Sequence, residues 1–169
     1  METSSLQKNQ PHLESVFGPL SVEDNSEIRT ILSEVDKVLV QIAHHFGHDR
    51  AGWEGTGLEL TWNQSGQIAI SSNVGSSNQK GECVDFCVEL RPSWYFGERS
   101  PLLTWDVEAS VEADCRHSAD HGHMHTVNEI SVRIESPIDA ALKLLTAARE
   151  LQKLAEISLE HWLELASDT

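Results

Sequence analysis

The strongest constraint in this sequence is the run 103–115, where apolar and polar side chains alternate without a break. A period of two is that of a β-strand, whose successive side chains point to opposite faces of a sheet. One face of this strand would be apolar, and the other carries a ladder of acids. The run therefore predicts a long strand with a core face and an acidic face.

Similar alternation predicts four more strands, at 56–62, 67–71, 83–91 and 123–135. The sequence Asn-Gln-Ser-Gly between the first two is typical of a hairpin turn. In the last strand, we expect the even positions from Met124 to face the core and His123 and His125 to share the acidic face. Loops are expected at 73–81 and 92–101, the second beginning where Pro92 ends a strand.

Apolar residues at a spacing of three to four predict two helices. The first begins at Asp24 or Ser26 as N-cap and ends at Gly47. The second begins at Ser136-Pro137 and continues to Ala166, about 30 residues or roughly 45 Å. Its apolar residues form more than one stripe, so it needs two partners. These are the sheet and either the first helix or the same helix of a second copy in a homodimer.

The order of these elements predicts an α+β fold, a five-stranded antiparallel meander sheet with an N-terminal and a long C-terminal helix packed on one face. Residues 26–169 would form a single α+β domain. Residues 1–25 are polar, and Pro11 and Pro19 argue against a helix there. We expect them to form a flexible or docked N-terminal arm.

The charge of the chain narrows the range of partners. Its 27 acidic residues against 12 lysines and arginines give a formal net charge of −15. Nucleic acids and anionic membranes attract clustered cations, so neither is an expected partner, whereas a basic protein is. Three cysteines cannot all pair within one chain, and the N-terminus carries no signal-peptide pattern, which predicts a cytoplasmic protein.

A histidine-rich hairpin is the first candidate site. Imidazoles and carboxylates suit divalent Zn, Ni, Cu or Fe. If the two strands pair in regular register, Asp114 lies opposite His125 and Asp106 opposite Arg133, all on the acidic face. The alternative is a polar turn, because strand neighbours two residues apart lie nearly 7 Å from each other. The candidate metal ligands are Asp114, His117, Asp120, His121, His123 and His125.

The second candidate is a protein-binding surface with two parts. The loop 92–101 carries aromatic anchors of the kind that dominate interface energetics, and the acidic strand face could meet a basic partner. The alternatives are a loop that caps the core and a face that is only solvated. The candidate partner-binding residues are Trp94, Tyr95, Phe96, Arg99, Asp106, Glu108 and Glu112.

These features favour a non-catalytic acidic interaction module, such as an inhibitor, immunity factor or chaperone. The sequence has no phosphate-binding loop, dinucleotide fingerprint or nucleophile elbow. A metal-binding protein or metal-dependent enzyme built on the histidine hairpin is the alternative, and no other cofactor is expected. A further alternative is a small-ligand carrier, with Trp62, Trp105 and Trp162 converging between sheet and last helix.

Overall fold

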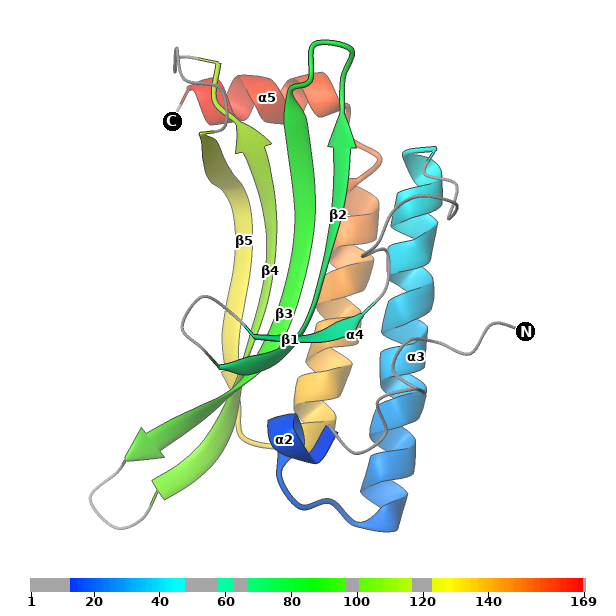
Figure 1. Ribbon diagram of the computed structural model, residues 1–169, viewed down its shortest axis with the longest axis vertical. Coiled ribbons are helices and arrows are strands. Elements are labelled where there is room, and N and C mark those ends of the chain that lie inside the picture. Colours follow the sequence, from blue (N-terminus) through cyan, green and yellow to red (C-terminus); the bar gives the residue numbers. More distant parts are fainter. Residues whose placement is uncertain (1–12, 48–57, 63–66, 97–100, 117–122, 169) are drawn as a thin grey trace.

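The computed structural model describes residues 13–47, 58–62, 67–96, 101–116 and 123–168. It confirms the α+β fold, with one antiparallel sheet in the order β1-β2-β3-β4-β5 (Figure 1). Each strand pairs with the next along the chain, as a meander requires. The strands are β1 Glu59–Trp62, β2 Ile68–Ser77, β3 Cys83–Phe96, β4 Pro101–Asp114 and β5 Met124–Ile134.

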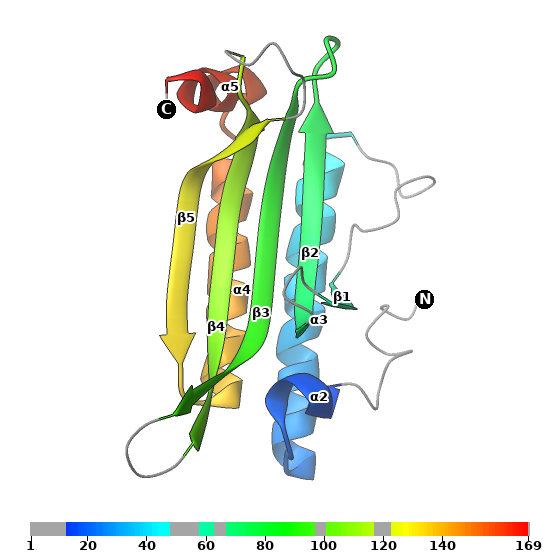
Figure 2. The same ribbon diagram turned by 60° about the vertical axis from the view of Figure 1, so that its left-hand side comes forward.

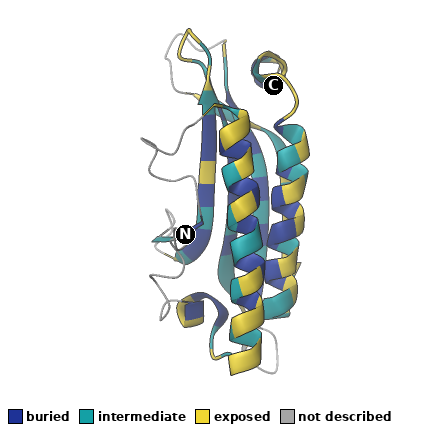
Figure 3. Cartoon of the chain, turned by 90° about the vertical axis from the view of Figure 1, so that its right-hand side faces the viewer, coloured by how far each residue is buried: buried dark blue, intermediate teal, exposed yellow. Residues whose placement is uncertain are grey.

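The described helices lie on one side of the sheet. Two long helices run side by side along it, and two short ones lie at its opposite ends (Figures 1 and 3). None of the described helices combines the length and apolar composition needed to cross a membrane. The helices are α2 Leu13–Phe17, α3 Val22–His45, α4 Pro137–Leu154 and α5 Leu159–Ser167.

The core lies between the two long helices and the inner strands β2, β3 and β4. The apolar positions of β3 from Val84 to Leu90 and of β4 from Trp105 to Ala113 alternate as the sequence predicts, and they face the helices. Alanines on α4 are buried against them, which lets the helix approach the sheet closely. The residues of β3 and β4 that are at most 1% exposed on this face are Val84, Phe86, Val88, Leu90, Val107, Ala109, Val111 and Ala113.

Strands β2 and β3 are longer than predicted. The loops expected at 73–81 and 92–101 are largely strand, since β2 continues to Ser77 and β3 continues through Pro92 to Phe96. The pairing explains why proline is tolerated. Leu90 is the last residue of β3 that pairs with β2, so Pro92 has a strand neighbour on one side only. A proline, which lacks an N–H donor, fits where no second neighbour requires one.

The prediction of one long C-terminal helix is wrong. Helix α4 ends at Leu154, and Ser158 caps a separate helix α5 by accepting a hydrogen bond from the His161 amide. A serine side chain that satisfies a free amide of the first turn favours a new helix start. The second apolar stripe of α4 packs against α3, so its width requires no second copy of the chain.

The N-terminal segment contains a helix, which the two prolines argued against, and this helix is docked on the core. Helix α2 fits between the two prolines, and its Val16 and Phe17 are buried. The Trp105 indole donates a hydrogen bond of 2.8 Å to the Val16 carbonyl, and its ring lies 6.1 Å from that of Phe17. The N-cap of α3 is Ser21 rather than Asp24 or Ser26, so residues 22–25 belong to this helix.

Candidate functional site

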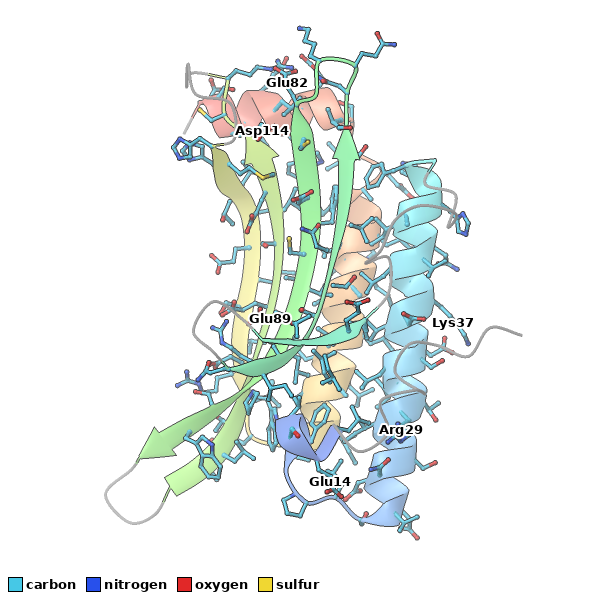
Figure 4. All side chains as sticks on the ribbon, in the orientation of Figure 1. Glu14, Arg29, Lys37, Glu82, Glu89 and Asp114 are labelled. Atoms are coloured by element: carbon cyan, nitrogen blue, oxygen red, sulfur yellow. The ribbon has the colours of Figure 1, made fainter. Side chains whose placement is uncertain are left out.

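The sheet face opposite the helices, called here the open face, carries most of the charged strand residues. The β1–β2 hairpin bends across it near Glu89 (Figures 1 and 4). From there towards Asp114, no described helix or strand covers it (Figures 1 and 2). Its members on β3 and β4 are Asp85, Cys87, Glu89, Arg91, Asp106, Glu108, Ser110, Glu112 and Asp114.

Near the β1–β2 hairpin, the acids of the open face form ion pairs with two arginines of the same face. Glu89 and Glu108 lie directly opposite each other on adjacent strands. One Arg91 nitrogen, Nη1, donates to both carboxylates at 2.9 and 3.1 Å. Arg133 binds Asp106 through Nε at 2.7 Å, in the pairing predicted from the sequence. Two predicted partner-binding acids, Asp106 and Glu108, are therefore already paired with arginines.

Nearer α5, a second pair of acids has a different environment. Asp85 and Glu112 also lie directly opposite each other. Within the described residues, no lysine or arginine forms an ion pair with either carboxylate. Cys87 occupies the position two residues beyond Asp85, as Arg91 does beyond Glu89. Burial, together with the charge of Glu112, raises the pKa of the Cys87 thiol to about 12. This thiol stays neutral at physiological pH and supplies no charge.

The aromatic segment lies on a projecting hairpin rather than in a free loop. Strands β3 and β4 continue past α2 (Figure 1), with Trp94 paired with Leu103. The Trp94 side chain is 58% exposed, and Leu102 is 45% exposed. Trp94 is therefore available to a partner. Tyr95 and Phe96 belong to β3, but their side chains and the whole of Arg99 lie outside the described residues.

The register predicted for the histidine hairpin is wrong at its far end. A β-bulge leaves Val127 without a partner, since Val111 pairs with Asn128 and Glu112 with Thr126. One extra residue reverses the face of the strand residues on its other side, here those before Val127 in the chain. Met124 consequently pairs with Asp114, while His125 pairs with Ala113 on the helix side.

The bulge separates the described metal-ligand candidates. His123 and His125 stack with ring centroids 4.5 Å apart, on the side of the sheet opposite Asp114. In the part of the chain that the structure describes, no group of three His, Cys, Asp or Glu residues could hold a metal ion. His117, Asp120 and His121 lie outside the described residues, so the metal-site hypothesis remains a prediction.

The tryptophans predicted to line a ligand cavity do not converge. Trp105 packs against α2, whereas Trp162 belongs to α5 and meets Phe86 at a ring distance of 6.5 Å. These helices lie at opposite ends of the sheet (Figure 1). The side chain of Trp62 is outside the described residues. The carrier hypothesis loses the observation that suggested it.

A charged cluster that the sequence did not reveal holds α5 to the sheet. Arg116 donates to Glu82 at 2.9 Å and to Glu160 at 2.7 Å, and its amide donates to Ser167. Hydrogen bonds from Arg116 and Asn78 lower the pKa of Glu82 to about 2. The partners lie 34 and 44 residues from Arg116, so no local spacing signals the cluster.

Comparison with known proteins identifies no relative. No family model matches the chain, and no curated protein or solved structure gives a match. The open face and the projecting hairpin are therefore the features of the molecule that suggest a function.

Proposed function

We propose that this chain is a non-catalytic, acidic protein-interaction module that binds a basic segment of another protein on the open face. The observation that carries the proposal is the Asp85–Glu112 pair. Like charges directly opposite on adjacent strands destabilise a sheet. The Glu89–Glu108 pair shows the compensation that such a pair receives elsewhere on this face, a guanidinium bridging both carboxylates. A lysine or arginine of the partner would compensate Asp85 and Glu112 in the same way.

Neighbouring acids extend the proposed contact. Asp114 lies two residues beyond Glu112, and Glu129 pairs with Ser110 on the adjacent strand. Asp114 also accepts a hydrogen bond of 2.7 Å from the Cys83 amide, which holds its carboxylate at the β3 side. An extended basic segment could therefore meet several carboxylates at once, and the net charge of −15 would accelerate the encounter.

The projecting hairpin supplies a second, apolar contact. Tryptophan is enriched among the residues that dominate binding energy at interfaces. Trp94 is more than half exposed, near the end of β3, where the β3–β4 hairpin projects to one side of the helices in Figure 1. We assign it the role of an anchor beside the charged contact. Cys83, Cys87 and Cys115 are all free thiols, which fits a partner in the reducing cytoplasm.

The test uses short fluorescent peptides with arginine at every second position, and the same peptides with glutamine in place of arginine. Binding is measured by fluorescence anisotropy to the wild type and to Asp85→Asn/Glu112→Gln. The wild type should bind the arginine peptides. The variant should bind them at least about fivefold more weakly, which corresponds to about 1 kcal/mol. The same variant should unfold at a higher temperature, because the like-charge repulsion has been removed.

The matched control is Glu27→Gln/Glu164→Gln, which changes the net charge equally at exposed helix positions away from the open face. It should retain wild-type peptide affinity. Equal weakening by both double variants would show that net charge alone drives binding, and would refute a site at Asp85 and Glu112. Absence of binding by the wild type would refute the proposal as a whole.

A further inference from the structure

The two edges of the sheet differ greatly in length. The β1 edge has 4 residues, whereas the β5 edge has 11. Within the described chain, no strand pairs with the outer side of β5, which forms a free side of the sheet in Figure 2. A long edge presents a row of unpaired backbone N–H and C=O groups, ready to pair with another strand.

The sequence of β5 lacks the usual protection of an edge strand. Proteins often place proline, lysine or a bulge on such strands to block pairing. Strand β5 contains neither proline nor lysine, and its bulge at Val127 lies close to its start. Residues 128–134 follow in regular register. This seven-residue stretch is a complete template for a further strand.

We propose that β5 pairs antiparallel with β5 of a second copy of this chain, about a twofold axis through Ser131, giving a continuous ten-stranded sheet. A twofold interface must be complementary to itself. With Ser131 opposite Ser131 of the second copy, Glu129 of each copy lies opposite Arg133 of the other. Each dimer thus gains two pairs of opposite charges on its open face.

The arginine can serve both partners. Arg133 uses Nε and Nη2 to bind Asp106, and its side chain is 54% exposed. Its Nη1 remains for Glu129 of the second copy. On the helix side, the same register places Ile130 opposite Val132, both half-buried in the single chain. Apolar contacts on one face and charge pairs on the other both favour this alignment.

Other twofold registers are less favourable. Directly opposite residues must share a face, so the axis must pass through a residue and the register changes in steps of two. An axis through Glu129 places Glu129 opposite Glu129 of the second copy. An axis through Val132 places Glu129 opposite Glu135 of the second copy. Both registers bring like charges together. An axis through Ile130 leaves Glu129 opposite Ser131. An axis through Ile134 also places Arg133 opposite Glu135, but it lies at the last residue of β5 and leaves the rest of the strand unpaired. Only the axis through Ser131 combines directly opposite charges with pairing along the whole of 128–134.

The helices leave room for the second copy. Helix α4 packs mainly on β4 and β3, inside the β5 edge. Helix α5 lies at the end of the sheet where β5 starts, so the twofold axis places the two α5 helices at opposite ends of the dimer (Figure 1). The edge is therefore accessible along residues 128–134.

Sedimentation equilibrium over a range of protein concentrations gives the first test. The wild type should show a mass rising with concentration to twice the 18.8 kDa of one chain. Glu129→Lys places a lysine opposite Arg133 in both halves, and should weaken association at least about tenfold while leaving the circular dichroism spectrum unchanged. A mass that stays at 18.8 kDa at every concentration would overturn the proposal.

Crosslinking tests the register. In a Cys83→Ser/Cys87→Ser/Cys115→Ser background, Ser131→Cys should be joined to a covalent dimer by a short bismaleimide, since opposite residues lie about 5 Å apart. The matched control is Thr126→Cys, also exposed on β5, whose two copies would lie roughly 34 Å apart. A dimer in which Ser131→Cys fails to crosslink, or in which Thr126→Cys crosslinks as well, would place the interface elsewhere and overturn the proposal.

Discussion

Glu82 shows how a single side chain can join segments that are distant in the sequence. It receives hydrogen bonds from Asn78 in its own turn and from Arg116, which also binds Glu160 of α5. The pKa of Glu82 is lowered to about 2 by these bonds, the one from Arg116 first. Glu82 therefore stabilises the fold when its side chain is ionised, and not when it is protonated.

The pH dependence of stability follows from this direction. Because the folded pKa of about 2 lies below the ordinary 4.5, the stabilisation is complete above pH 4.5 and is lost as the pH falls towards 2. Glu82→Gln should lower the free energy of unfolding in urea at pH 7 and have a smaller effect at pH 2. The control Glu27→Gln lies near the start of α3, at the other end of the molecule from α5 (Figure 1). A loss from Glu82→Gln that is equal at both pH values would contradict this account.

At the scale of an element, the docking of α2 depends on Trp105. The indole hydrogen bond to the Val16 carbonyl is buried, and the ring covers Phe17. Trp105→Phe keeps an aromatic ring but leaves the carbonyl without its donor. We expect a loss of about 1–3 kcal/mol in the free energy of unfolding, measured by urea denaturation. Trp94→Phe, at an exposed position, should change it by less than about 0.5 kcal/mol. Equal losses would mean that the hydrogen bond has no special role.

Strand patterns could be predicted from the sequence because the alternation from Leu103 to Ala113 reflects which face each residue buries. The limits of the elements were harder to predict, since they depend on neighbours. Pro92 continues a strand only because β2 has already diverged from β3. Ser158 starts a new helix inside an apolar pattern that reads as one helix from Pro137 onwards.

The candidate site was predictable only in part. The acidic face of β4 follows directly from the alternation, and so does the pairing of Asp106 with Arg133. The bridging of Glu89 and Glu108 by Arg91 was not predictable, because it requires the register between two strands. The bulge at Val127 leaves no mark in the sequence, so simple alternation predicts the wrong face for His123 and His125.

At the scale of the whole molecule, the net charge of −15 opposes compact folding through mutual repulsion. Salt screens such repulsion, with a Debye length that shortens from about 30 Å at 0.01 M to about 8 Å at 0.15 M. The thermal unfolding midpoint should therefore rise between 0.01 M and 0.15 M NaCl, as measured by circular dichroism. A midpoint that falls with salt would mean that the ion pairs of Arg91, Arg116 and Arg133 outweigh the general repulsion.

The bulge in β5 also has a consequence for what a shift of register would do at this end of the sheet. If Val127 entered the ladder and paired with Glu112, Thr126 would pair with Ala113 and His125 with Asp114. Met124 and Thr126 would then turn to the helix side. A surface of imidazoles beside carboxylates would arise without any change in the sequence. The two arrangements differ only in whether Val127 is paired, and the bulge keeps the two sets of groups apart.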